Sequence, residues 1–349
     1  MSRATGFLFV CLLVPALTSS SCAPAPRGAA ATPAAADTAT VGAASTEPSP
    51  PEAPNSAAPA QSPPAASPPT LGELELKDVK RVLESPVHSL GFGKKGRAAA
   101  LGTDAYMDSG RGFEKLTAPA SVSEHVQIYF GRDNMPRIMG YAGTGGGEGV
   151  YGRWRKQTWQ RGLDEIGRLG AGSSPFFGVL GYADPEVVCR VGEVCLVKRL
   201  TGWKTVNPPP GTPQVVLLSG SVAWAFDRTA LYRLHHDKEW RKLDGVPSLT
   251  DATALAGGDD NLWVGSGGGV LHHFDGKAWS QRVAPTGSIR GMLAEDKVLW
   301  VVGDDGALFF DGAAWKRVKG VQGPLSIAAR DEDGALWFAG KSGVWKAQP

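Results

Sequence analysis

Two cysteines lie close together near the middle of the chain and could form a disulfide. Cys189 and Cys195 flank a short segment with Gly192 at its centre. This symmetry predicts a β-hairpin that places the two thiols opposite each other. In an oxidising compartment such a pair forms a disulfide, and a loop this short stabilises the fold by about 2 kcal/mol. Metal binding is the weaker alternative, because no second Cys or His pair flanks the segment.

Another cysteine, Cys22, follows a segment typical of an export signal. Residues 1–17 carry one early charge, Arg3, and then an apolar run that is too short to span a bilayer. Small residues at 18–21 lead directly into Cys22, with Ser19 where Leu is usual, and the junction resembles a bacterial lipobox. The resemblance implies cleavage after residue 21 and acylation of Cys22, with palmitate among the expected chains. Two alternatives stay open, namely ordinary cleavage that leaves Cys22 free, and an uncleaved anchor.

Residues 22–72 are expected to form a disordered spacer behind this cysteine. From Ala23 to Thr70 the chain is almost entirely Ala, Pro, Ser and Thr. Such a segment lacks the large apolar side chains that offset the entropy of ordering. The spacer would hold a folded domain, residues 73–349, clear of a membrane; a secreted protein with a disordered tail would have the same composition. Ala23 after the cysteine favours the outer membrane in a bacterium with two membranes.

Composition and motifs exclude several function classes. The net charge is +2 without long basic runs, which argues against nucleic acid as a partner. The chain has no nucleophile elbow, phosphate-binding loop, zinc-protease helix or dinucleotide fingerprint. The doublets His235–His236 and His272–His273 cannot chelate a metal alone, because adjacent residues of a strand point to opposite faces. We therefore expect no metal site and no cofactor.

A repeat dominates the C-terminal half. One column of tryptophans holds Trp224, Trp263, Trp300 and Trp337, and a second holds Trp203, Trp240, Trp279 and Trp315, with intervals of about 36 to 39 residues. Each second-column tryptophan begins a short strand, and two follow a Phe-Asp-Gly turn. Four short strands joined by Asp/Gly turns at this period are typical of β-propeller blades. The tryptophans are expected to pack between adjacent blades.

The same columns predict the number of blades and how the ring closes. The C-terminal unit ends after three strands, and the strand at Val79–Val82 mirrors the fourth strands of the other units. We therefore predict an all-β propeller of seven four-stranded blades, with the last blade completed by this N-terminal strand. Six and eight blades are the alternatives. A ring closed in this way removes exposed sheet edges, so the domain is expected to be monomeric.

The shape of the last unit resembles a known repeat. Residues 331–344 read Asp-x-Asp-Gly-x-Leu-Trp-x-x-Gly-x-x-Gly-Val, similar to the two-component-regulator propeller repeat. The resemblance implies a blade, and it implies kinship with extracytoplasmic sensor regions that are thought to bind ligands such as carbohydrates. It is good over residues 250–349, fair over 203–249 and poor before. A signalling role does not follow, since neither a kinase domain nor a transmembrane helix comes after the repeats.

Ligands of propellers usually gather at the mouth of the central channel, around the starts of the innermost strands. In this chain those positions hold His88, His125, Gln214, Asp251 and Arg290. Asp251 and Arg290 could orient a polar ligand, or they could pair with each other and plug the channel. Long insertions around residues 141–155 and 173–186 are a second place for a binding rim.

Two functions are consistent with this sequence. The leading prediction is a membrane-tethered envelope lipoprotein whose propeller binds a protein or glycan without catalysis. The alternative is a hydrolase or lyase that uses polar groups at the channel mouth on a carbohydrate or similar substrate. An enzyme needs carboxylates and basic groups that converge on one point, whereas a scaffold does not.

Overall fold

The computed structural model describes residues 71–117, 124–131, 133–141, 149–161, 176–180, 187–190, 195–199, 202–210, 215–219, 222–227, 229–235 and 239–349. Within these residues the chain forms twenty-nine β-strands and no helix, which confirms the predicted all-β class. The described part accordingly holds no helix long and apolar enough to cross a membrane. The predicted export segment and nearly all of the predicted spacer lie outside the described residues.

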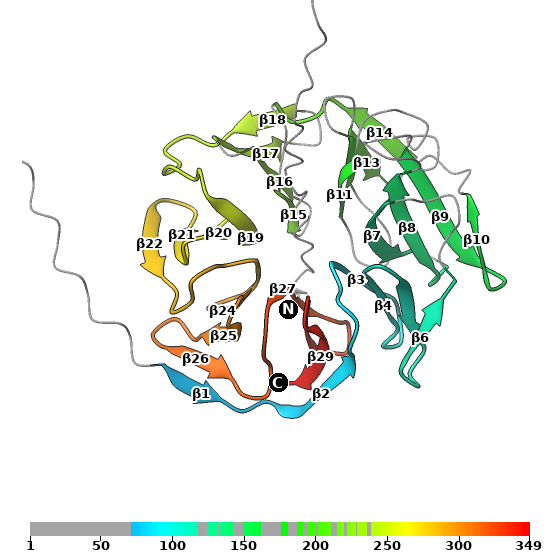
Figure 1. Cartoon of the computed structure of the whole chain (residues 1–349). Helices are drawn as coiled ribbons and strands as arrows, with labels where there is room; N and C mark the ends of the chain where they lie inside the picture. The colour runs from blue at the N-terminus through cyan, green and yellow to red at the C-terminus, as the bar shows by residue number, and fades with distance from the viewer. Residues whose placement is uncertain are drawn as a thin grey trace, which may run out of the picture. The chain divides into compact units, whose positions relative to one another are not determined.

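The described strands form seven sheets, one after another along the chain (Figure 1). The first four sheets hold β3 (Ser89–Phe92), β4 (Ala98–Leu101), β5 (Ala105–Asp108) and β6 (Phe113–Leu116); β7 (Glu124–Phe130), β8 (Pro136–Tyr141), β9 (Gly149–Arg155) and β10 (Thr158–Arg161); β11 (Phe176–Leu180), β12 (Val187–Arg190), β13 (Cys195–Arg199) and β14 (Gly202–Val206); and β15 (Val215–Ser219), β16 (Val222–Phe226), β17 (Leu231–His235) and β18 (Glu239–Lys242). The last three hold β19 (Ala252–Gly258), β20 (Asn261–Ser266), β21 (Val270–Phe274) and β22 (Trp279–Val283); β23 (Gly291–Glu295), β24 (Val298–Gly303), β25 (Gly306–Phe310) and β26 (Trp315–Val318); and β27 (Leu325–Arg330), β28 (Leu336–Gly340) and β29 (Gly343–Gln348).

Two N-terminal strands join the last two sheets. β2 (Lys77–Leu83) contains the predicted strand at Val79–Val82 and pairs antiparallel with β29. β1 (Gly72–Leu74), which the sequence does not signal, pairs parallel with β26 and makes the sixth sheet five-stranded. The first strand therefore begins at the end of the segment assigned to the spacer.

Most of the consecutive sheets contact each other in chain order. The first strands of neighbouring sheets contact each other for β3 with β7, and along the series β11, β15, β19, β23 and β27. The seventh sheet meets the first, because the Val87 amide donates to the Gly340 carbonyl at 2.9 Å. Within each sheet, one end holds the turns between first and second and between third and fourth strands. We call this the hairpin end, and the opposite end, which holds the links between sheets, the connection end.

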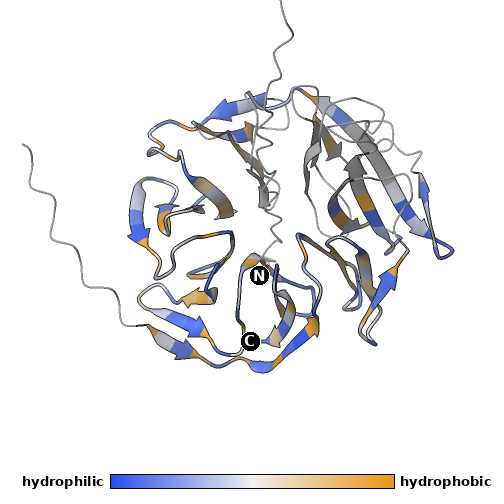
Figure 2. Cartoon of the chain, in the orientation of Figure 1, coloured by the Kyte–Doolittle hydropathy of each residue, from blue (hydrophilic) through white to orange (hydrophobic). Residues whose placement is uncertain are grey.

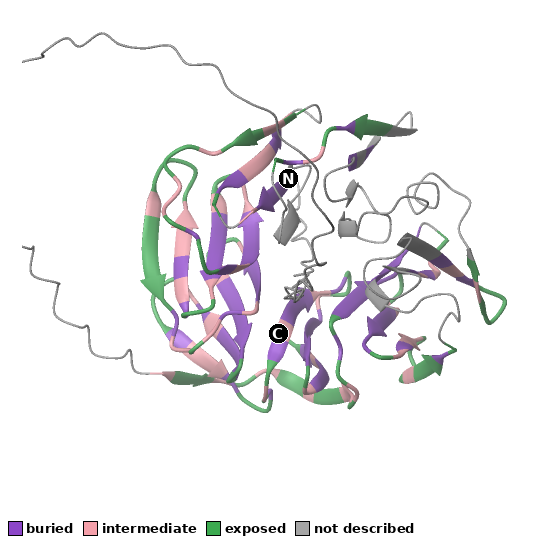
Figure 3. Ribbon diagram, turned by 45° about the horizontal axis from the view of Figure 1, so that its top comes forward, coloured by how far each residue is buried: buried purple, intermediate pink, exposed green. Residues whose placement is uncertain are grey.

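The core is formed mainly by the first and second strands of the sheets, and the fourth strands are the most exposed. β24 and β28 are almost fully buried, whereas β18 and β22 are mostly exposed. Figure 2 shows hydrophilic residues along β22 and β26. Figure 3 shows that burial is concentrated in the inner strands of each sheet and that the outer strands are mostly exposed. This gradient is expected of sheets whose outer strands face water and whose inner strands pack between neighbours.

Tryptophans of the first column bridge adjacent sheets, as the repeat predicts. The Trp263 ring lies 6.3 Å from that of Phe310 in the next sheet, and the Trp300 ring lies 6.0 Å from that of Phe338. Trp337 lies 5.4 Å from Phe92 and so joins the seventh sheet to the first. These contacts explain the periodicity of the first column as packing between sheets. In the second column, the rings of Trp279 and Trp315 lie against Phe274 and Phe310 of their own sheets.

The Phe-Asp-Gly turns at the hairpin end have a common geometry. The Asp311 carboxylate accepts hydrogen bonds from the amides of Ala314 at 2.8 Å and Ala313 at 3.0 Å. These backbone donors hold the pKa of Asp311 at about 2. Gly312 has a φ of 96°, which a residue with a side chain rarely adopts. The motif therefore shapes a turn.

Candidate functional site

The predicted channel-mouth residues are distributed unevenly over the structure. His88 is exposed directly before β3, and its amide donates to the Leu101 carbonyl at 2.8 Å. His125 lies in β7 opposite Gly140, but its side chain is outside the described residues. Gln214 is outside them altogether. Asp251 and Arg290 lie at the connection ends of the fifth and sixth sheets. Hydroxyl and carboxyl side chains lie near both residues.

Arg290 belongs to a cluster at the beginning of the sixth sheet. Its Nε donates to Asp304 Oδ1 at 2.7 Å, and Ser288 Oγ donates to Asp304 Oδ2 at 3.0 Å. The bond from Arg290 is the main reason why the pKa of Asp304 lies below its usual value. Thr286 Oγ1 lies 3.4 Å from Asp305 Oδ2. We call these residues the Arg290 cluster.

This pairing replaces the Asp251–Arg290 pair that the sequence suggested as a plug. The β23–β24 hairpin sets the partner, because Gly291 is in register with Val302 and the Arg290 amide donates to the Val302 carbonyl at 2.8 Å. Continuing that register places Arg290 next to the turn that carries Asp304. Extending the residue pairs of the β23–β24 hairpin beyond Gly291 and Val302 would have predicted the Arg290–Asp304 pair from the sequence.

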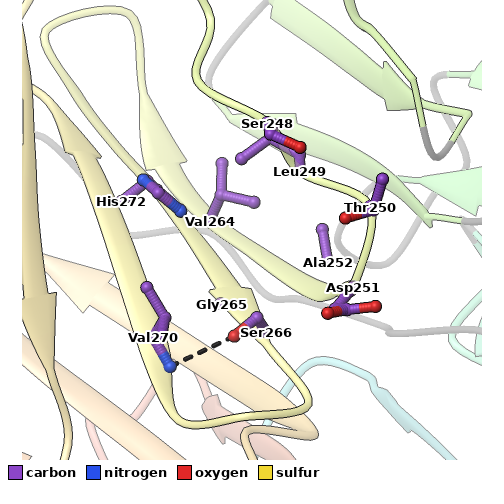
Figure 4. Close-up of a pocket in the computed structure, with 10 residues that line it drawn as sticks. All are labelled: Ser248, Leu249, Thr250, Asp251, Ala252, Val264, Gly265, Ser266, Val270 and His272. Atoms are coloured by element: carbon purple, nitrogen blue, oxygen red, sulfur yellow. Dashed lines mark hydrogen bonds between the residues drawn. The ribbon is translucent and has the colours of Figure 1, made fainter. Parts of the chain in front are cut away.

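Asp251 lies at the edge of a cavity of about 130 Å³ over the fifth sheet (Figure 4). The lining residues come from the link before β19 and from β19, β20 and β21: Ser248, Leu249, Thr250, Asp251, Ala252, Val264, Gly265, Ser266, Val270 and His272. In Figure 4 the Asp251 and Ser266 side chains lie at one end of this group and His272 lies toward the other. We call it the Asp251 cavity. The lining therefore includes Ala252 at the beginning of the first strand of this sheet.

Strand register determines which histidine reaches the cavity. Val264 and His272 are direct cross-strand partners, and Val270 lies two residues before His272, so all three share one face. His273 points to the other face and stacks on Trp263, with ring centroids 4.0 Å apart. The sequence interpretation correctly separated the two faces, but it treated His272 as a solvated residue. Because His272 is the cross-strand partner of Val264, which is buried, the strand register assigns His272 to the face that lines the cavity.

The Asp251 cavity and the Arg290 cluster are physically connected. The Ile289 amide donates to the Ser266 carbonyl at 3.1 Å, and the Gly267 amide donates to the Asp251 carbonyl at 3.0 Å. Backbone hydrogen bonds therefore tie the link before β23 to the turn after β20, and that turn to Asp251. The two groups form one continuous surface at the connection end of the fifth and sixth sheets.

The polar side chains of the cavity are not joined as a catalytic triad in the described residues. Although Ser, His and Asp all line the cavity, a triad needs the nucleophile bonded to the base and the base to the carboxylate. Ser266 Oγ instead accepts from the Val270 amide at 3.1 Å, and within the described residues no hydrogen bond joins Asp251 to His272. Among those residues no group of three or more His, Cys, Asp or Glu is placed to hold a metal ion.

The predicted cysteine pair lies on neighbouring strands of the third sheet. Cys189 on β12 is in direct register with Cys195 on β13, across the hairpin that the sequence suggested. The Cys195 side chain is fully buried, and that of Cys189 is outside the described residues. The disulfide itself stays a prediction that this register supports.

Comparisons with known proteins define the fold. No family model matches the chain, and no curated protein matches it. Among solved structures, YCF48 bound to D1 peptide aligns at a TM-score of 0.60 and 14% identity over 80% of this chain and 100% of that one. A streptogramin B lyase aligns at 0.57 and 12% over 77% and 96%. The extracellular domain of the hybrid two component system BT3049 from B. thetaiotaomicron aligns at 0.53 and 13% over 76% of this chain and 39% of that one.

These similarities show a β-propeller built from repeats, and at such low identity they show the fold alone. The BT3049 domain also supports the resemblance to propeller repeats of sensor regions that residues 331–344 suggest.

Proposed function

We propose that this chain is an exported, lipid-anchored envelope protein whose propeller binds a protein partner at the connection end of the fifth and sixth sheets. The observation that carries the proposal is the continuous surface made by the Asp251 cavity and the Arg290 cluster. Their polar groups lie on links and turns that flank the mostly buried strands β19, β20, β23 and β24, and these strands hold them in a rigid frame. A non-catalytic module needs such a frame, and it does not need a nucleophile.

The structural neighbours are compatible with this function. YCF48 was solved with a bound peptide, and BT3049 is the extracellular domain of a two component system. Binding of a peptide and an extracellular location are therefore both known for this fold. The carbohydrate-active alternative has less support, since the Ser, His and Asp side chains of the cavity are not joined as a catalytic unit.

A photo-cross-linking experiment tests the proposed surface. Benzoyl-phenylalanine at Thr250, which is exposed at the cavity, is expected to capture a partner protein in intact cells. The same probe at Lys277, which is exposed at the hairpin end of the same sheet, is the matched control and should capture little. Equal capture of one protein from both positions, or capture from Lys277 alone, would place binding elsewhere.

The lipid anchor and the closed ring are parts of the proposal. We propose acylation at Cys22, a spacer up to about residue 70, and placement in the outer membrane. We also propose that the seven sheets are seven blades of a ring closed by β2. The β2–β29 pairing and the contact between Val87 and Gly340 support closure.

Replacing the anchor cysteine gives the second prediction. Cys22→Ser is expected to abolish incorporation of labelled palmitate and to slow the migration of the protein, because a chain without the acylated cysteine is not cleaved after residue 21. Labelling and immunoblotting of the unaltered chain and of Cys22→Ser measure both changes. Equal labelling and equal migration of the two proteins would contradict acylation at Cys22.

A further inference from the structure

The size of the Asp251 cavity restricts what can occupy it. Sites that enclose a whole small molecule usually span ~300–1,000 Å³. At about 130 Å³ the cavity encloses a smaller group, and one long side chain of a larger partner is of that size.

The cavity wall combines an apolar part with acceptors. Leu249 and Val264 are buried and supply the apolar part. Asp251, Thr250 and Ser266 supply a carboxylate and hydroxyl groups close to solvent. A side chain with an aliphatic stem and a polar end fits such a wall, because the stem covers apolar surface while the head stays near water.

The charged residues of the cavity lining determine whether the polar end of the bound side chain is a cation or an anion. Asp251 is the one carboxylate among the ten lining residues, and none of the ten is Lys or Arg. In the part of the chain that the structure describes, the Asp251 carboxylate makes no hydrogen bond or ion pair of its own. Burial lowers the pKa of His272 below its ordinary value, which favours the uncharged ring. A cation is favoured here and an anion is repelled.

We propose that the Asp251 cavity receives a lysine side chain of the partner protein, with its stem against Leu249 and Val264 and its ammonium at Asp251. This inference rests on the proposed function, which it deepens by naming the recognised group. Lysine suits the site better than arginine. The compact ammonium donates in three directions, toward a carboxylate and hydroxyls, whereas a guanidinium needs acceptors arranged for its planar fork.

An NMR titration of the exported full chain tests the proposal with three small probes. They are the Nα-acetyl methylamides of lysine, norleucine and glutamate, with glucose as a fourth ligand. We expect saturable shifts of the Ala252 methyl and His272 ring signals with the lysine probe. The norleucine probe, which has the stem without the charge, should bind about three- to fivefold more weakly, as one exposed ion pair allows. The glutamate probe and glucose should cause no saturable shift.

Two variants complete the test. Asp251→Asn is expected to weaken the lysine probe to the level of norleucine, while Asp260→Asn, at the hairpin end of the same sheet, leaves the difference unchanged. Equal binding of the lysine and norleucine probes, preference for glutamate or glucose, or a difference that survives Asp251→Asn would overturn the inference. The cross-linking result is independent of it. Capture at Thr250 without any preference for lysine would leave the proposed function intact and reject only the lysine site.

Discussion

Deletion of residues 71–83 from the full chain is expected to leave a protein that does not reach a cooperatively folded state at 37 °C. The deletion removes β1 and β2, and with them the outer strand that β29 pairs with. It also removes Leu71, Leu74, Leu76 and Val79, which pack against the largest core cluster. The loss amounts to several kcal/mol, whereas a whole domain is stable by only about 5–15 kcal/mol. Exposing the edge of β29 adds a risk of aggregation.

The matched control removes an equal length of the Ala/Pro-rich segment before residue 70. Thermal unfolding followed by tryptophan fluorescence compares the two deletions, and the spacer deletion should unfold like the unaltered chain. If the protein without residues 71–83 unfolded at the same temperature, the N-terminal segment would not be part of the propeller, and closure by β2 would be wrong.

The second large effect is expected at Asp331, whose side chain is 1% exposed. One oxygen accepts from the Ala335 amide at 2.8 Å and from the Asp333 amide at 3.1 Å, and the other accepts from Trp337 Nε1 at 2.8 Å. Asp331→Ala leaves at least two buried donors without an acceptor, at a cost of about 3 kcal/mol or more. The midpoint of thermal unfolding should fall by roughly 5–10 °C.

Two further variants separate this effect from general damage to the turn. Asp331→Asn keeps the shape but places an amide where either a backbone N–H or the indole N–H needs an acceptor, so it should also destabilise. Asp305→Asn, an exposed acid at the connection end, is the control and should change stability by less than about 0.5 kcal/mol. Stability of Asp331→Ala close to that of the control would show that the buried carboxylate does not hold the turn.

The C-terminal sheets were predictable because their contacts are local. Trp337 and its Asp331 acceptor are six positions apart, and each strand pairs with the next along the chain. Tryptophans and Asp-Gly turns that recur at a regular interval are therefore enough to predict the strands of these sheets. β1 was not predictable in this way, since three residues without alternation pair with β26 far along the chain.

The candidate site was only partly predictable. The sequence indicated Asp251 and Arg290 as strand starts and left open whether they pair with each other, whereas the structure pairs Arg290 with Asp304 of its own sheet. The cavity depends on how the link at Ser248–Asp251 crosses the face that holds Val264 and His272. Nothing in the local pattern of the link encodes that crossing, whereas strand register alone would have identified the face.

Hydrogen–deuterium exchange of the full chain, with and without the partner captured at Thr250, tests the central claim most directly. The account predicts that the partner slows exchange at residues 248–252 and 284–290, the links that carry the Asp251 cavity and the Arg290 cluster. Exchange at the hairpin-end turns, residues 259–260 and 275–278, should stay unchanged. Protection confined to the hairpin end would contradict a binding surface at the connection end of the fifth and sixth sheets.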